Sequence, residues 1–285
     1  MYLTPHFERA AAYESELHKD ISNFTVDEII TFYKMYFSPS VYTLATLNSQ
    51  LQFYAQYALA HGMVTDHQNH FAEINYELLL TCVNKGLVEQ RVITRDELLK
   101  KLYEITDNWD ERFICLGLFE GICGDEYEEL AGISEKDFVD GDIVHLCTGR
   151  DLKISHELVH MGIESCNCYD HTVYKRDGTL ASRKLDPGDD KAIKKMYNAQ
   201  LDTKRSRYRR IFNCLVRLSE RSQMKSLNSK ALRDSGRIHI IQNLMREHNM
   251  ENPIECVFAY RNVIEDRFGK MYSIPRWVAK YREYF

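Results

Sequence analysis

Apolar residues recur at helical spacing along the first third of the chain. Between residues 39 and 61 they are separated by alternating steps of three and four, which places them on one face of a helix: Leu44, Leu47, Leu51, Tyr54 and Ala58. The segments 25–37, 69–85 and 94–105 show the same period. We therefore expect residues 1–106 to form one all-helical domain.

Side chains that cap helices mark several of the expected helix starts. Thr25 and Glu28, and again Thr94 and Glu97, have the spacing of a capping box, in which both side chains bond to free backbone amides. The segment 252–255, Asn-Pro-Ile-Glu, offers a capping Asn followed by Pro at the first helical position. These signals predict helices that begin near residues 26, 95 and 253.

The pattern changes after the polar stretch 106–108, so we expect a second domain over residues 107–285. It begins with a helix at 110–119 and an acidic helix at 125–130. Strands are predicted at 142–147 and 151–154, joined by Thr148-Gly149-Arg150, and Asp177-Gly178 has the sequence of a tight hairpin turn. Helices are expected again from about residue 191. The fold class predicted for the whole chain is mostly α with a small β-sheet.

Composition favours a soluble protein of the cytoplasm. Hydrophobic residues make up 44% of the chain, and no apolar run approaches the roughly 18 residues that a membrane-spanning helix needs. The first twenty residues contain no apolar segment typical of a secretory signal. The eight cysteines are therefore expected to be reduced thiols. We expect no membrane partner and no cofactor.

Charge is distributed very unevenly behind a net charge of only −5. Residues 104–142 hold thirteen acidic and two basic residues, a net charge of −11. Residues 191–237 hold fourteen basic and three acidic residues, a net charge of +11. A basic segment of this density favours binding to the phosphates of a nucleic acid.

The basic segment also has helical order. Arg207, Arg210, Arg217 and Arg221 fall in one narrow arc, beside an apolar arc that contains Leu215. Two alternatives remain: a solvated helix face, or a face paired with the acidic stretch. In the nucleic-acid interpretation, the expected phosphate contacts are Lys204, Arg205, Arg207, Arg209, Arg210, Lys225, Lys230, Arg233 and Arg237.

Residues 118–145 resemble the catalytic domain of the tyrosine recombinases, the family of the phage integrases. The segments Leu118-Phe-Glu-Gly-Ile-Cys-Gly-Asp-Glu-Tyr-Glu-Glu-Leu130 and 133–145 agree with the family in spacing and in apolar positions, and so does the hairpin that follows. The first catalytic arginine of the family, however, falls on Cys123. A thiol cannot neutralise the charge of a phosphate, and the loss of one such donor typically costs about 10²–10³ in rate.

The second catalytic box of the family resembles Lys230-Ala-Leu-Arg-Asp-Ser-Gly236. The box retains Arg233, whereas Lys230 stands where the family has histidine. Gly269-Lys270 is a looser match to a later Gly-His pair. Tyr281 is the nearest candidate for the nucleophile that strand exchange requires, and Tyr272 is a second.

The N-terminal helices resemble the core-binding (SAM-like) domain of integrases, so the resemblance covers roughly residues 20–285. The combination is similar to the master lysogeny repressors of SPβ-like temperate phages. It implies a repressor of transcription in the host bacterial cytoplasm that binds double-stranded DNA without exchanging strands. Because integrases often exchange their last helix between subunits, residues 275–285 also imply a possible homo-oligomer. An active recombinase that uses Tyr281 remains the first alternative.

A second alternative is a zinc-dependent hydrolase. His156-Glu-Leu-Val-His160 fits the His-Glu-x-x-His pattern, in which two histidines on one helix face bind zinc and Glu157 activates water. Further ligands could come from Cys166, Cys168 and His171. The motif begins directly after a predicted strand, however, which places His156 in the first helical turn, and the chain is expected to bind no metal.

Overall fold

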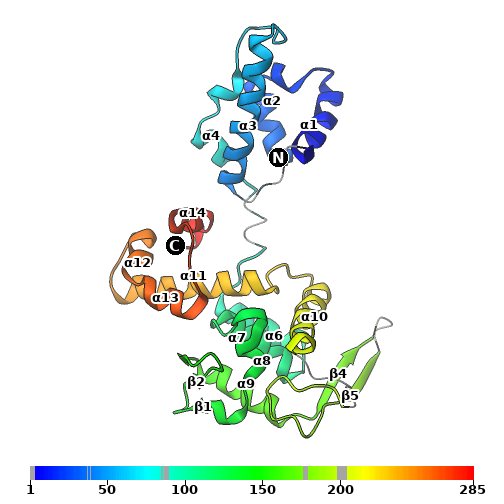
Figure 1. Ribbon diagram of the computed structural model, residues 1–285, viewed down its shortest axis with the longest axis vertical. Helices are drawn as coiled ribbons and strands as arrows, with labels where there is room; N and C mark the ends of the chain where they lie inside the picture. The colour runs from blue at the N-terminus through cyan, green and yellow to red at the C-terminus, as the bar shows by residue number, and fades with distance from the viewer. Residues whose placement is uncertain are drawn as a thin grey trace. The chain divides into compact units, whose positions relative to one another are not determined.

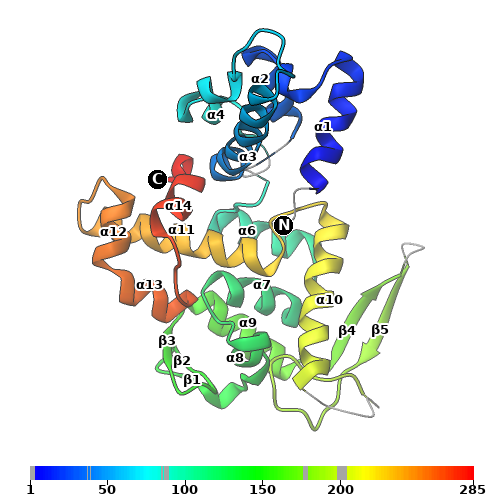
Figure 2. The same ribbon diagram turned by 45° about the horizontal axis from the view of Figure 1, so that its top comes forward.

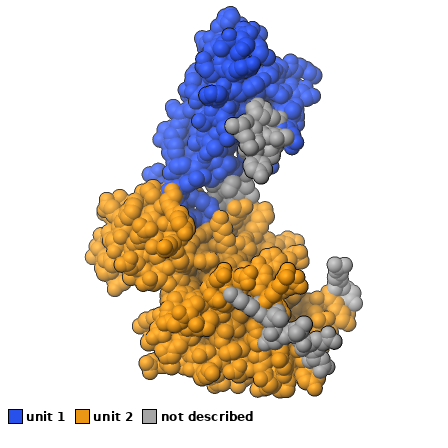
Figure 3. All heavy atoms as spheres, in the orientation of Figure 1, with its two compact units in different colours: residues 1–89, 276–282 blue, residues 90–275, 283–285 orange. Residues whose placement is uncertain are grey.

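The computed structural model describes residues 4–36, 38, 40–84, 86, 90–175, 179–197 and 204–285. The chain forms two compact units, residues 1–89 with 276–282 and residues 90–275 with 283–285 (Figure 3). The boundary expected at residue 106 therefore lies inside the second unit. The physical reason is that Leu98 and Leu102 pack into the hydrophobic core of that unit.

Unit 1 is entirely helical in its described part (Figure 1). Its main helices are α1 (Thr4–Leu17), α2 (Val26–Met35), α3 (Val41–Ala60) and α4 (Tyr76–Thr81), with short 3₁₀ turns η1 (Ile21–Asn23) and η2 (His70–Glu73). Most of the C-terminal helix α14 (Ile274–Lys280) also belongs to this unit. The core includes Phe24, Phe32, Leu44, Leu47 and Phe71.

One helix predicted for unit 1 is wrong in form. The segment 69–85 was expected to be a single helix, but it consists of η2, a break and the short α4. The break is stabilised by side chains, because Asn48 Nδ2 donates to the carbonyl of Phe71 and the Asn75 side chain caps α4. Asx side chains of this kind compete with a continuous helix for backbone groups.

Unit 2 is built around the helix α7 (Trp109–Phe119), which is buried from Asp110 to Phe119 and packs against α9 (His156–Asn167) and α11 (Ser229–Glu247) (Figures 1 and 2). Gly236 permits a close approach here, since a Cβ atom would overlap the backbone of Phe119. The remaining elements are α6 (Arg95–Ile105), η3 (Asp125–Tyr127), α8 (Glu128–Gly132), η4 (Glu135–Asp137), α10 (Lys204–Ser222), α12 (Pro253–Ala259), α13 (Arg261–Phe268) and η5 (Arg282–Tyr284), the last of which straddles the two units.

Two small antiparallel sheets complete unit 2. One has the order β1 (Phe138–Val139), β2 (Ile143–His145) and β3 (Asp151–Lys153), so the predicted hairpin at 142–154 is confirmed. Strand β1 is only two residues long and was not predicted. The other sheet pairs β4 (Asp170–Tyr174) with β5 (Leu180–Lys184), as expected around Asp177-Gly178, although that turn lies outside the described residues.

The helices expected from residue 191 begin later. Residues 191–197 instead form isolated β-bridges, and α10 begins at Lys204. Asp189 explains the difference, because its carboxylate accepts from the backbone amides of Lys191 and Lys195 and so stabilises a loop. In Figures 1 and 2, α10 and the β4–β5 hairpin lie side by side.

Other expectations from the sequence are confirmed. Thr25 and Thr94 both form capping boxes, and Asn252 caps α12 with Pro253 inside the first turn. All eight cysteines are free thiols. Within the described ranges, no helix combines the length and the apolar character needed to cross a membrane.

Candidate nucleic-acid interface

The inward face of α10 is bound to carboxylates of the same unit. Arg207 Nη2 lies 3.2 Å from Asp189 Oδ2, and Arg210 Nη2 lies 2.6 Å from Asp110 Oδ2. Both guanidinium groups are mostly buried. Because a phosphate would first have to break these ion pairs, we do not retain Arg207 and Arg210 among the candidate phosphate contacts.

The rest of the arginine arc has the same kind of partner. Arg217 and Arg221 approach the buried carboxylate of Glu111, at 3.4 and 3.8 Å. Arg221 also donates to the carbonyl of Ile105 and stacks on Tyr174. For Arg210, Arg217 and Arg221, the structure therefore agrees with the alternative in which the arc pairs with the acidic stretch, whereas Arg207 pairs with Asp189 outside that stretch.

The carboxylates of Asp110 and Glu111 belong to a buried polar cluster at the start of α7. His171 lies between two carboxylates, with Nδ1 3.2 Å from Asp110 and Nε2 3.9 Å from Glu111. Burial acts to raise the pKa of Asp110, but the hydrogen bond with His171 and the charge of Arg210 hold that pKa well below its ordinary value. Asp110 is thus a carboxylate that keeps α10 and β4 attached to α7.

The outward face of α10 has a different character. Arg205 and Arg209 are exposed, and neither has a carboxylate partner in the described part of the chain. Phe212, Asn213 and Val216 continue the same exposed face. The ring of Phe212 is parallel to that of Tyr208, with the centroids 6.3 Å apart. The side chain of Lys204, another predicted contact, lies outside the described residues.

Two more predicted contacts are exposed near the start of α11. Lys225 precedes that helix and Lys230 lies in its first turn, and neither side chain has an ion-pair partner among the described residues. Together with Arg205 and Arg209 they give four exposed cations on consecutive elements. We call these four side chains the outer cations.

Arg233 lies deeper, beside Cys123. Its Nη2 donates to the carbonyl of Phe268 at 2.5 Å, and its Nε is buried without a hydrogen-bond partner. Burial raises the pKa of the nearby Cys123 thiol more than the charge of Arg233 lowers it. Cys123 is therefore a neutral thiol. Arg237 donates to the same Phe268 carbonyl at 2.6 Å.

Arg150 is a residue of this site that sequence reasoning missed. It is the last residue of the β2–β3 turn and forms two hydrogen bonds of 2.6 Å with Glu129, which also accepts from the amide of Cys123. The only signal was its place in the tight turn Thr148-Gly149-Arg150. The site thus brings a neutral cysteine together with three arginines, at positions 150, 233 and 237.

The two tyrosines considered as nucleophiles have opposite environments. Tyr281 belongs to unit 1, is 2% exposed, and its hydroxyl accepts a 2.6 Å hydrogen bond from Lys280. Tyr272 belongs to unit 2 and is 84% exposed. A buried hydroxyl engaged in this way cannot attack a phosphate without a local rearrangement.

The predicted zinc motif is not assembled as a metal site. His156 Nδ1 contacts the carbonyl of Gly141, and His160 packs edge-on against Trp109. Glu157, the expected base, forms a 2.8 Å ion pair with Arg95. The described ranges contain no group of three residues arranged to hold a metal ion. Of the possible further ligands, His171 is bound in the cluster with Asp110.

Sequence profiles of known families match both parts of the chain. The profile described as the C-terminal catalytic domain of MrpR matches residues 92–255. The profile described as the N-terminal core-binding domain of MrpR matches residues 3–60. No curated protein matches the chain.

Proposed function

The chain belongs to the MrpR family, and from this premise we propose that it is a sequence-specific repressor of transcription that binds double-stranded DNA and does not exchange strands. Its architecture is tyrosine-recombinase-like, with a core-binding domain followed by a catalytic-type domain. The same fold can serve different functions, so the proposal is argued from the site.

The observation that carries the proposal is the set of outer cations. The arginines on the inward face of α10 are used by buried carboxylates, whereas Arg205, Arg209, Lys225 and Lys230 remain unpaired and exposed in the described chain. Cations that do not stabilise the fold are available to displace counterions from DNA. We therefore assign phosphate binding to these four side chains, and the resemblance to the second recombinase box adds Arg233.

The exposed face of α10 also offers side chains that can read bases. Arginine suits guanine, asparagine suits adenine, and an apolar side chain suits the methyl group of thymine in the major groove. Asn213, and Phe212 with Val216, provide the last two types on the same helix face as the phosphate-binding Arg209. This mixture supports sequence-specific binding rather than a purely electrostatic contact.

Two observations support the absence of strand exchange. Cys123, on which the resemblance places the first arginine of the recombinases, is a buried, neutral thiol, so it provides no charge for a scissile phosphate. Tyr281 is buried and bonded to Lys280. The resemblance to the master repressors of SPβ-like phages supports the finer proposal that the protein maintains lysogeny.

The proposal is tested by selecting DNA fragments. Purified full-length protein is mixed with fragments of its source genome and excess competitor DNA, and the retained fragments are sequenced. We expect a few fragments that share one short element. If no fragment is retained at moderate salt, the protein is not a DNA-binding repressor.

A second candidate function, an active recombinase, is favoured only by the exposed hydroxyl of Tyr272. A suicide DNA substrate distinguishes the two functions, because a nucleophilic tyrosine leaves a covalent adduct that survives denaturation. We expect no adduct with the wild-type protein. An adduct that disappears in Tyr272→Phe or Tyr281→Phe would establish strand cleavage and identify its nucleophile.

A further inference from the structure

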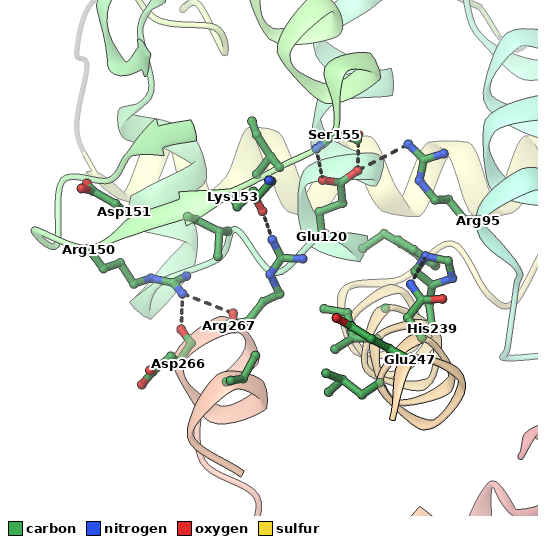
Figure 4. Close-up of a pocket in the computed structure, with 18 residues that line it drawn as sticks. Arg95, Glu120, Arg150, Asp151, Lys153, Ser155, His239, Glu247, Asp266 and Arg267 are labelled. Carbon is green, nitrogen blue, oxygen red and sulfur yellow. Dashed lines mark hydrogen bonds and ion pairs between the residues drawn. The ribbon is translucent and has the colours of Figure 1, made fainter. Parts of the chain in front are cut away.

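A cavity of about 920 Å³ lies in unit 2 between β3, α11 and α13 (Figure 4). Much of its wall is apolar, with Phe119 and Ile240 among the lining residues, and Leu244 and Val263 completing that side. A volume of this size suits a small organic molecule, and such sites commonly combine an apolar wall with a few placed polar groups. None of the outer cations lines this cavity.

Among the arginines and lysines of the described chain that line this cavity, Arg267 is the one without a carboxylate partner. Its one hydrogen bond among the described residues goes to the carbonyl of Lys153, and no carboxylate lies within ion-pair distance of it (Figure 4). Arg233 and Arg237 each have a buried Nε atom without a hydrogen-bond partner, whereas Arg267 has no such buried nitrogen. Its remaining N–H groups therefore open into the cavity.

The charges around Arg267 have opposite signs. Burial lowers the pKa of Arg267, the negative charge of Glu120 opposes this effect, and the positive charge of Arg150 adds to it. Both carboxylate oxygens of Glu120 already accept hydrogen bonds from Ser155, and one of them lies 3.8 Å from Arg95. A guanidinium in this setting would gain from a charge-assisted hydrogen bond to a bound anion.

The rim limits the kind of anion that can enter. Glu247 and Asp266 are exposed lining residues, and neither carboxylate has an ion-pair partner in the described chain. They repel a polyanion such as DNA, so Arg267 is not part of the proposed DNA interface. A single carboxylate on an apolar body meets less repulsion and can bury that body against Ile240 and Val263.

We propose that this cavity is a binding site for a small organic monocarboxylate, with the carboxylate at Arg267 and the apolar body against α11 and α13. In Figure 4 the Arg267 side chain lies among the labelled lining residues, with its guanidinium group directed toward Lys153. The site does not depend on DNA binding, and it makes use of an arginine that the proposed interface leaves without a role.

The test uses octanoate and 1-octanol, which share an apolar chain and differ in charge. Each is titrated calorimetrically into the full-length protein in the absence of DNA. We expect octanoate to bind at least about tenfold more tightly than 1-octanol, since a charge-assisted hydrogen bond separates them. Arg267→Gln keeps a donor for the Lys153 carbonyl but should remove this preference.

Two further variants keep the test decisive. Arg261→Gln, on the same helix but paired with Glu265, should leave octanoate binding unchanged. Val263→Trp fills the cavity from an exposed position and should weaken both ligands, even if Arg267→Gln does not fold. Equal affinity for the two ligands, an unchanged preference in Arg267→Gln, or no binding of octanoate would each overturn the proposal.

Discussion

The two faces of α10 carry similar residues and have different roles. On the inward face, Arg207 and Arg210 contact buried carboxylates and attach the helix to the core of unit 2. On the outward face, Arg205 and Arg209 have no such partner in the described residues. The comparison shows that a count of basic residues overestimates a nucleic-acid interface, because the buried pairs must first be subtracted.

The comparison predicts that the inward pairs contribute to stability and the outward cations do not. The largest effect is expected for Asp110→Ala, which leaves Arg210 and His171 buried beside a missing charge. Removing one partner of a buried pair typically costs about 3–5 kcal/mol. The free energy of unfolding, measured by urea denaturation, should fall by that amount.

The matched control is Asp107→Ala, on the same segment. The Asp107 side chain is 80% exposed and lies 3.7 Å from Arg112. Its removal should change the free energy of unfolding by less than about 0.5 kcal/mol. Similar losses in the two variants would show that Asp110 has no special role in attaching α10.

The pH dependence of stability tests the same cluster more gently. The pKa of Asp110 in the folded protein lies below its ordinary value of 3.8. The groups that contact its carboxylate are His171 and Arg210, and Glu111 lies on the other side of His171. A lowered pKa gives stability that is fully present above pH 3.8 and is lost as the pH falls through the folded-state pKa. The difference in the free energy of unfolding between wild type and Asp110→Asn should therefore be constant from neutral pH down to about pH 5. It should shrink in more acidic solution. If this difference in the free energy of unfolding stayed constant at all pH values, Asp110 would not be the source of the pH-dependent stability.

The smallest effect is expected for one apolar contact on the outward face. If Phe212 contacts a thymine methyl group, replacing that thymine by deoxyuridine in the operator should cost about 0.8 kcal/mol, or roughly fourfold in Kd. In Phe212→Ala the same replacement of thymine should leave Kd unchanged. A double-mutant cycle over the two proteins and the two operators measures this coupling. Equal sensitivity of both proteins at every thymine would remove Phe212 from the base-reading face.

Local signals in the sequence predicted much of the fold. The capping boxes at Thr25 and Thr94 fixed two helix starts, because their hydrogen bonds involve only neighbouring residues. The hairpin at 142–154 was also predicted from local pattern. The loop at 191–197 was not, since it depends on Asp189 and on pairing with residues distant in the chain.

The candidate site was predicted less completely, for a related reason. Arg205, Arg209, Lys225 and Lys230 were named from the sequence, and the structure leaves them exposed. Periodicity placed Arg207 and Arg210 on one face, but it could not show that Asp189 and Asp110 lie opposite. Partners that are distant in sequence decide whether a basic residue is available to a ligand.

The central claim, that the outward face of α10 binds DNA phosphates, is tested most directly by the salt dependence of operator binding. The variant Arg205→Ala/Arg209→Ala is compared with wild type and with Arg246→Ala/Arg261→Ala, two exposed arginines on other helices. We expect the logarithmic salt slope to fall in magnitude by about 1.8 in the first variant, about 0.9 for each phosphate contact, and to stay unchanged in the second. An unchanged slope in Arg205→Ala/Arg209→Ala, with the fold intact, would contradict the assignment of the DNA interface to this face.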